Sequence, residues 1–222
     1  MKKLIYIAQI LFCLAPLAVF AQPQSASQGE KWEQKIKRYE RQDSLTRPAP
    51  NMLLFVGSST IENWKTLSDD FPDHLVLNRG VSGTKTIDLY NFRKRLIEPY
   101  QPKKIFIYEG DNDIGLGWKT EAIMTQFKQL IEAIREAKPQ AELIFISIKL
   151  SPRRLKDQAQ VEEVNAGIKA YLATIPNTRY ADVYTPMLGP DGEIIAEYYR
   201  EDGLHLTPAG YGVWKQVIGA FL

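Results

Sequence analysis

Short apolar runs and amphipathic segments alternate along most of this chain. Each apolar run is three to six residues long and rich in Leu, Ile, Val and Phe, which is typical of a strand buried on both faces. Strands separated by helical segments indicate a parallel sheet of the α/β class. The five predicted strands cover residues 52–56, 75–77, 105–108, 143–148 and 180–183.

The segments between the strands carry apolar residues at helical spacing. Residues 120–137 show it most clearly, with Ile123, Phe127 and Ile134 on one face. Residues 158–173 and 208–221 are predicted to be helical as well. An amphipathic helix over residues 30–45 carries Trp32, Ile36 and Tyr39 among many charges and ends before Pro48, so we expect it to pack on the domain.

The first residues are typical of a secretory signal peptide. Lys2 and Lys3 precede an apolar stretch that ends in Val19-Phe20-Ala21, and polar sequence follows. We therefore predict cleavage after Ala21, a secreted or periplasmic protein, a flexible segment over residues 22–29 and a single domain over residues 30–222. The alternative is an uncleaved anchor helix, which the short apolar stretch disfavours.

Cleavage would also change the cysteine content and the charge of the chain. The only cysteine is Cys13, so the mature protein would contain no thiol or disulfide. Without Lys2 and Lys3, 26 of the 28 basic residues remain, which equals the 26 acidic residues. A nearly neutral protein is not expected to bind nucleic acid or an anionic membrane surface.

Polar motifs follow the predicted strands, at the edge where parallel α/β sheets bind their ligands. Gly57-Ser58-Ser59 follows the first strand, Asn78-Arg79-Gly80 follows the second, and Glu109-Gly110-Asp111-Asn112-Asp113 follows the third. Asp202-Gly203-Leu204-His205 precedes the last helix. We therefore expect these four segments to meet in space.

Ser59, His205 and Asp202 are the candidate catalytic residues. A serine hydroxyl is a weak nucleophile at neutral pH, so it needs a histidine to take its proton and a carboxylate to hold that histidine in place. The chain has two histidines, and only His205 has a carboxylate at a spacing that lets the side chains meet on one turn. His74 is interpreted as a surface residue in a turn.

Three groups are candidates to stabilise a developing oxyanion, namely the backbone N–H groups of Ser59 and Gly80 and the side-chain amide of Asn112. Each feature also has a purely structural interpretation. Ser59 could cap a helix, Gly80 could serve a turn, and Asn112 could form an Asx turn. Their occurrence together with His205 favours the catalytic interpretation.

Metal and cofactor motifs are not expected. Asp111, Asp113 and Gly115 suggest a calcium loop, but the glycine is one position out of place and Ala122 stands where the glutamate should be. The histidines are not spaced for zinc, and no glycine-rich phosphate loop with a lysine occurs. The sequence therefore predicts chemistry without a metal or organic cofactor.

The order of the four segments resembles the four sequence blocks of the SGNH hydrolases, also called GDSL-type esterases and lipases, over residues 50–222. The resemblance implies a three-layer α/β/α sandwich with a flavodoxin-like five-stranded parallel sheet in the order 2-1-3-4-5. It also implies that Ser59 is the nucleophile, His205 the base and Asp202 the orienting carboxylate, with Ser59, Gly80 and Asn112 forming the oxyanion hole. Ser58 replaces the aspartate of the Gly-Asp-Ser motif.

The segments around Ser59 and His205 are similar to the branch near platelet-activating-factor acetylhydrolase-like esterases, which favour short acyl groups. This similarity implies a secreted esterase that acts on a small-molecule or glycan ester, with an acetyl group as the expected acyl part. The alternatives are an acyltransferase or a lysophospholipase-type lipase of the same fold, and a non-catalytic glycan-binding module. Candidate substrate contacts are Arg79, Trp118, Lys149, Arg153 and Tyr198.

Overall fold

The fold is built on five parallel strands. The structure is a computed structural model that describes residues 27–222, and its sheet has the strand order β2-β1-β3-β4-β5. This order and the three-layer architecture confirm the expected fold class. The predicted signal peptide, with Cys13, lies outside the described residues. The strands are β1 (Leu53–Gly57), β2 (Val76–Gly80), β3 (Lys104–Tyr108), β4 (Glu142–Ile146) and β5 (Thr178–Ala181).

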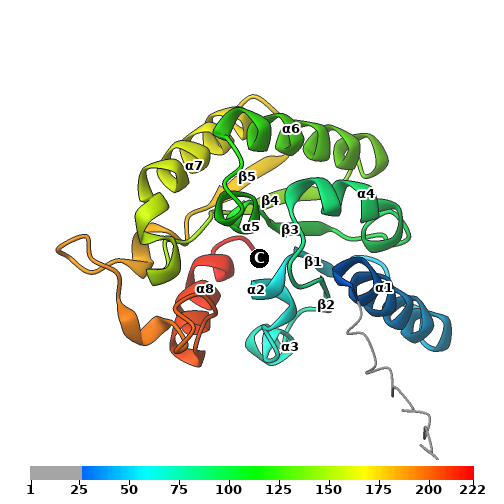
Figure 1. The fold of residues 1–222 in the computed structure, drawn as a ribbon. Coiled ribbons are helices and arrows are strands. Elements are labelled where there is room, and N and C mark those ends of the chain that lie inside the picture. Colours follow the sequence, from blue (N-terminus) through cyan, green and yellow to red (C-terminus); the bar gives the residue numbers. More distant parts are fainter. Residues whose placement is uncertain (1–26) are drawn as a thin grey trace, which may run out of the picture.

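Helices cover both faces of this sheet (Figure 1). One face packs against four long helices, α1 (Gln28–Leu45), α4 (Thr86–Leu96), α6 (Thr120–Ala137) and α7 (Gln158–Leu172). The other face packs against α2 (Ser59–Glu62), α3 (Leu67–Asp70) and α8 (Pro208–Gly219). The remaining elements are the helix α5 (Asp111–Gly115) and the 3-10 turns η1 (Pro152–Asp157), η2 (Thr185–Met187) and η3 (Ala196–Tyr198).

Alternation along the strands divides the core into two clusters. Leu54 and Val56 of β1 face the four long helices, whereas Leu53 and Phe55 face α8, since successive side chains of a strand point to opposite sides. The second cluster is aromatic, with the ring centroids of Phe55 and Phe106 4.5 Å apart. Both faces of the central strands are therefore buried, as their continuous apolar sequences predict.

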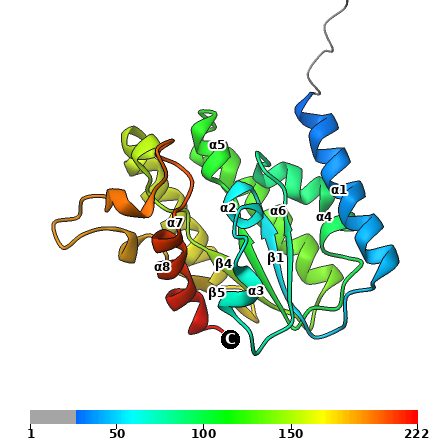
Figure 2. The same ribbon diagram turned by 90° about the horizontal axis from the view of Figure 1, so that it is seen from below.

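The strand ends are in register where the polar motifs begin. Gly57, the last residue of β1, pairs with Gly80 of β2 on one side and with Tyr108 of β3 on the other. The segments that follow these three residues therefore leave the sheet at the same level. In the view turned by 90°, α2 and α5 lie together at this edge (Figure 2).

The first helix begins earlier than its apolar pattern indicates. Ser27 caps α1 by accepting a hydrogen bond from the backbone of Glu30, whose carboxylate accepts one from the Ser27 backbone in return. Residues 28 and 29, which were expected to belong to a flexible segment, are therefore helical. The rest of the predicted segment 22–29 lies outside the described residues, apart from the cap itself.

One long helix, α4, is missing from the sequence prediction. In α4 the apolar residues are interrupted by the charged run Arg93-Lys94-Arg95, which weakens the helical pattern. The carboxylate of Asp88 accepts a hydrogen bond from the Lys85 backbone at 3.0 Å and so satisfies one N–H at the start of α4.

Among residues 27–222, no helix has the length and apolarity needed to cross a membrane.

We expect Phe55→Ala to destabilise the fold strongly, because Phe55 is fully buried between Phe106, Phe71 and Trp64. Its loss should lower the free energy of unfolding by about 3–5 kcal/mol. Leu45→Ala is the matched control, since this leucine is 81% exposed and its loss should change stability by less than about 0.5 kcal/mol. Urea unfolding of both variants measures the difference, and equal effects would contradict the assigned core.

Candidate active site

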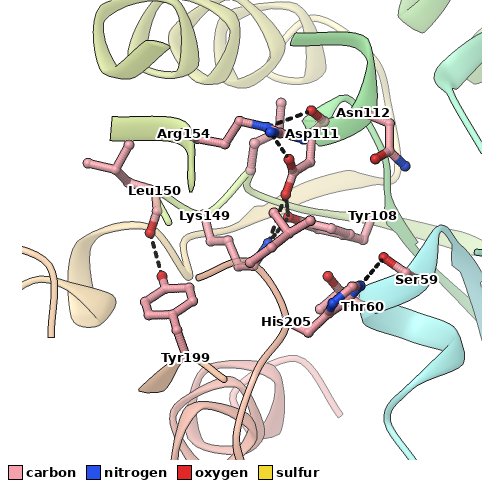
Figure 3. A network of polar contacts seen from close by, with 12 residues as sticks. Ser59, Thr60, Tyr108, Asp111, Asn112, Lys149, Leu150, Arg154, Tyr199 and His205 are labelled. Carbon is pink, nitrogen blue, oxygen red and sulfur yellow. Dashed lines mark hydrogen bonds and ion pairs between the residues drawn. The ribbon is translucent and has the colours of Figure 1, made fainter. Parts of the chain in front are cut away.

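Three side chains from two distant segments form a chain of hydrogen bonds at the carboxyl end of the sheet. Ser59 is the first residue of α2, and only Ser58 separates it from the end of β1. Its Oγ lies 3.0 Å from Nε2 of His205, and Nδ1 of His205 lies 2.6 Å from Oδ2 of Asp202 (Figure 3 shows the contact between Ser59 and His205). The structure thus brings together the three residues that the sequence predicts.

The surroundings of Asp202 determine where the protons of this chain lie. The side chain of His205, and then the backbone N–H groups of His205 and Leu204, hold the pKa of Asp202 well below its usual value. Because an ionised carboxylate only accepts hydrogen bonds, Nδ1 of His205 carries the proton. When the ring is neutral, Nε2 is an acceptor for the Ser59 hydroxyl, which is the arrangement needed for proton removal.

The loop that carries His205 is closed by backbone contacts. Tyr199 and Leu206 form an antiparallel bridge, and the Arg200 N–H donates to the His205 carbonyl at 2.8 Å. Between them, Gly203 has a φ of +63°, and its carbonyl accepts a hydrogen bond from the Arg153 N–H at 2.9 Å. The His205 side chain remains 25% exposed, so an ester could reach its ring.

Glycine is required at position 57 for Ser59 to occupy its place. A Cβ on Gly57 would lie 2.1 Å from the carbonyl oxygen of Tyr108, and the φ of Gly57 is +138°. The chain therefore turns sharply from β1 into α2 while touching β3. Among the described residues, none accepts a hydrogen bond from the Ser59 N–H, which is a free donor of the first helical turn.

Gly80 does not match the predicted role of oxyanion donor. Its N–H already donates to Oδ1 of Asn78 at 2.9 Å, and a Cβ would lie 2.3 Å from the backbone N of Glu62. Gly80 therefore serves the packing of β2 against α2. Three residues further along the chain, Gly83 is exposed, has a φ of +82° and donates its N–H to no described residue. This glycine was not among the donors predicted from the sequence.

Asn112 lies beside the loop that contains Gly83. Its Nδ2 donates to the carbonyl of Thr84 at 2.9 Å, which ties α5 to that loop. A side-chain amide has two N–H groups, so one of them is not used by this bond. The half-buried Asn112 thus keeps a donor, as the sequence predicts.

Arg79 is not a substrate contact, contrary to the expectation. Its side chain forms an ion pair with Asp43 of α1, while its Nε donates to the Tyr100 hydroxyl at 2.7 Å. The guanidinium also lies 4.6 Å from the ring centroid of Tyr39. Arg79 is 5% exposed and fastens α1 to the sheet.

Lys149 is likewise a structural residue, because its side chain is fully buried. Its Nζ lies 2.8 Å from Oδ2 of Asp111, and Arg154 contacts the other carboxylate oxygen at 2.8 Å (Figure 3). Burial acts to raise the pKa of Asp111, but the two cations outweigh it and hold that pKa below its usual value. The two ion pairs of Asp111 hold the start of α5 in place, next to Asn112. Arg154 was not among the residues singled out from the sequence.

The other three candidate substrate contacts stay predictions. Arg153 is exposed, and its backbone contacts the loop of His205. Trp118 is half-buried and packs against the first core cluster, and Tyr198 is half-buried and packs against the second.

His74 lies just before β2, at the end of that strand opposite to the candidate site, with Nδ1 3.5 Å from Lys103 Nζ. No group of three or more potential metal ligands was found within residues 27–222.

Two buried acids support the loop between β2 and α4. Glu109 contacts the hydroxyl of Thr84 at 2.7 Å, and both carboxylate oxygens of Asp113 lie 3.2 Å from the backbone N of Thr86. Burial raises the pKa of Glu109 well above its usual value, and the nearby charge of Asp113 raises it further. Burial also raises the pKa of Asp113 to about 6. No local sequence pattern indicates either pKa shift.

A model of the GDSL-like lipase/acylhydrolase family matches residues 43–213. This span contains Ser59, Gly83, Asn112, Asp202 and His205. Among curated proteins, no sequence matches the chain significantly.

Solved structures share the fold. A proposed platelet activating factor from Streptococcus pneumoniae superposes with a TM-score of 0.74 at 23% identity, covering 86% of this chain and 92% of that one. A GDSL-like lipase from Bacteroides thetaiotaomicron gives 0.72 at 22%, covering 84% and 96%. A family 3 carbohydrate esterase from Clostridium thermocellum gives 0.61 at 17%, covering 76% and 93%. At these identities the likeness establishes the fold alone.

The raised pKa of Asp113 predicts a pH-dependent stability. The folded state binds this proton up to about pH 6, whereas an unfolded aspartate releases it near pH 4. The free energy of unfolding should therefore fall by about 2–3 kcal/mol as the pH rises from 4 to 7. Asp113→Asn removes this part of the pH dependence. Urea unfolding of both proteins across this range measures the difference, and a pH-independent difference would contradict the assignment.

Proposed function

This protein belongs to the GDSL-like lipase/acylhydrolase family, and from that premise we propose that it is a serine ester hydrolase that uses Ser59, His205 and Asp202. The observation that carries the proposal is the continuous hydrogen-bond chain from the Ser59 hydroxyl through His205 to the Asp202 carboxylate. A nucleophile, its base and the group that orients the base are the parts that acyl transfer to serine requires.

In the proposed reaction Ser59 Oγ forms a bond to the ester carbonyl carbon while Nε2 of His205 takes the hydroxyl proton. Collapse of the tetrahedral intermediate breaks the bond to the alcohol oxygen, which receives that proton from His205. Water then attacks the acyl-Ser59 ester with His205 again as the base, and the acid and free Ser59 result. Asp202 stabilises the imidazolium in both steps and stays ionised.

We propose that three N–H donors stabilise the negative oxygen of the tetrahedral intermediate. The backbone N–H groups of Ser59 and Gly83 have no acceptor among the described residues, and Asn112 keeps one amide N–H. Free, fixed donors stabilise developing charge without reorganisation during the reaction. Gly83 takes the place of Gly80 in this proposal, because the Gly80 N–H is already bound by Asn78.

The proposed substrate is a short-chain ester, with an acetylated carbohydrate as the leading class. The resemblance of the segments around Ser59 and His205 to acetylhydrolase-like esterases supports the acyl length. The carbohydrate is an analogy, to which the shared fold of the Clostridium thermocellum carbohydrate esterase adds support. A secreted or periplasmic location, proposed from residues 1–21, would give access to glycans outside the cell.

We expect Ser59→Ala to lower kcat for p-nitrophenyl acetate by about 10³-fold or more, because no nucleophile remains. The matched control is Ser58→Ala, which removes the neighbouring hydroxyl. The Ser58 side chain makes no capping hydrogen bond, so kcat should stay within about tenfold of the parent value. Labelling by a fluorophosphonate should be lost in the first variant only. Turnover that survives in Ser59→Ala would overturn the mechanism.

The acyl preference is tested with p-nitrophenyl esters from acetate to decanoate. The proposal expects the highest kcat/KM for acetate and release of acetate from acetylated oligosaccharides. A maximum for long chains would indicate a lipase, and transfer of the acyl group to an added sugar would indicate an acyltransferase. Glycan binding without hydrolysis or labelling would favour a binding module.

A further inference from the structure

The first helix lies almost entirely outside the part of the chain that the family model matches. The match begins at residue 43, whereas α1 spans Gln28–Leu45. In Figure 1, α1 lies next to α4 at the β2 edge of the sheet. Its apolar stripe contributes Ile36 and Tyr39 to the first core cluster, but its polar groups make contacts that packing alone does not need.

These polar contacts converge on one residue of the loop that follows β2. The carbonyl oxygen of Ser82 accepts hydrogen bonds from Trp32 Nε1 at 2.8 Å and from Gln28 Nε2 at 3.2 Å. The Ser82 N–H donates to Glu62 Oε2 at 2.7 Å, and Lys35 of α1 lies 2.8 Å from the other oxygen of Glu62. Both backbone groups of Ser82 are therefore held directly or indirectly by α1.

Holding the Ser82 carbonyl also determines the direction of the next N–H. The Ser82 carbonyl and the Gly83 N–H belong to the same peptide unit, which is planar and trans, so the two bonds point in opposite directions. Since the carbonyl points at α1, the Gly83 N–H points away from α1. Donors on the carbonyl also polarise the peptide and make its N–H a better donor.

Without these contacts the peptide could turn over. Gly83 has a φ of +82°, and glycine adopts positive and negative φ with similar ease, so the Ser82–Gly83 peptide has more than one accessible orientation. The reverse orientation would present the Ser82 carbonyl where Gly83 now presents its N–H. A carbonyl dipole there would repel a negative oxygen.

We propose that α1 positions the oxyanion site, with Trp32 as the main positioning residue and Gln28 in support. This inference rests on the proposed ester hydrolysis and adds residues that precede the matched family region. Trp32 touches no reacting atom. It acts by fixing the Ser82 carbonyl, and thereby the Gly83 N–H, in the orientation that receives the oxyanion.

The chain offers a matched control on the same helix. The Tyr39 hydroxyl donates to the Gly80 carbonyl at 2.6 Å, which is also a hydrogen bond from an aromatic side chain of α1 to this segment. The N–H of that peptide unit belongs to Val81 and donates to the Gly57 carbonyl at 2.8 Å. This peptide is therefore held from its other side as well, and loss of the Tyr39 hydroxyl should not turn it.

The test compares Trp32→Phe with Tyr39→Phe in the full chain. Each variant removes one donor and keeps an aromatic ring, so both should lower the melting temperature slightly. With p-nitrophenyl acetate, Trp32→Phe should lower kcat about tenfold and leave KM within about twofold, because the lost interaction acts in the transition state. Tyr39→Phe should keep kcat within about twofold. Equal kcat values for the two variants would overturn the proposal.

A second readout does not depend on catalysis. The residual dipolar coupling of the Gly83 N–H in ¹⁵N-labelled protein reports the direction of this bond. It should change in Trp32→Phe and remain as in the parent protein in Tyr39→Phe. If the parent protein hydrolyses no ester, the proposed function fails, yet this coupling still decides the positioning. An unchanged Gly83 coupling in Trp32→Phe would overturn it.

Discussion

The close approach of Gly57 to β3 is the constraint on which the candidate active site depends. A side chain at this position would collide with the Tyr108 carbonyl, so only glycine lets β1 end in contact with its neighbour. From this point the chain turns directly into Ser59, and the Gly57 carbonyl receives the N–H of Val81, which begins the next loop. The glycine at position 57 thus allows the nucleophile and the proposed oxyanion loop to lie at the same end of the sheet.

The loops at this edge are held by buried acids whose ionisation affects the stability of the fold in different ways. Asp111 is buried between two cations, and its lowered pKa shows that they more than offset the cost of burial. For Glu109 and Asp113, burial outweighs the nearby charge of Lys85, and their raised pKa values mean that charging either acid opposes folding. The loop between β2 and α4 is therefore tied to β3 and α5 at some expense of stability.

The sequence located β1, β3 and β4 well because each is mainly a short apolar run. It located β2 and β5 only in part, because polar residues make up about half of each strand. The order of the strands followed from the family resemblance. It missed α4, where the charged residues 93–95 interrupt the pattern, and it missed the start of α1 although Ser27 and Glu30 form a recognisable capping box. Arg79 and Lys149 follow the strands predicted from sequence and were therefore expected to be accessible. Their partners lie about 40 residues away in sequence, and no local pattern shows such pairs.

The choice between Gly80 and Gly83 shows why the site was harder to predict than the fold. The two glycines are three residues apart, and only the backbone N–H of Gly83 has no acceptor among the described residues, which is a property of the folded chain. The same applies to α1, whose aromatic stripe was interpreted as packing. A tryptophan or tyrosine in such a stripe carries a donor at its tip, and a buried donor needs an acceptor. An aromatic stripe on a helix therefore also implies that its donors hold a polar group of a neighbouring segment. In α1, Trp32 donates to the Ser82 carbonyl in the loop after β2, and Tyr39 donates to the Gly80 carbonyl at the end of that strand.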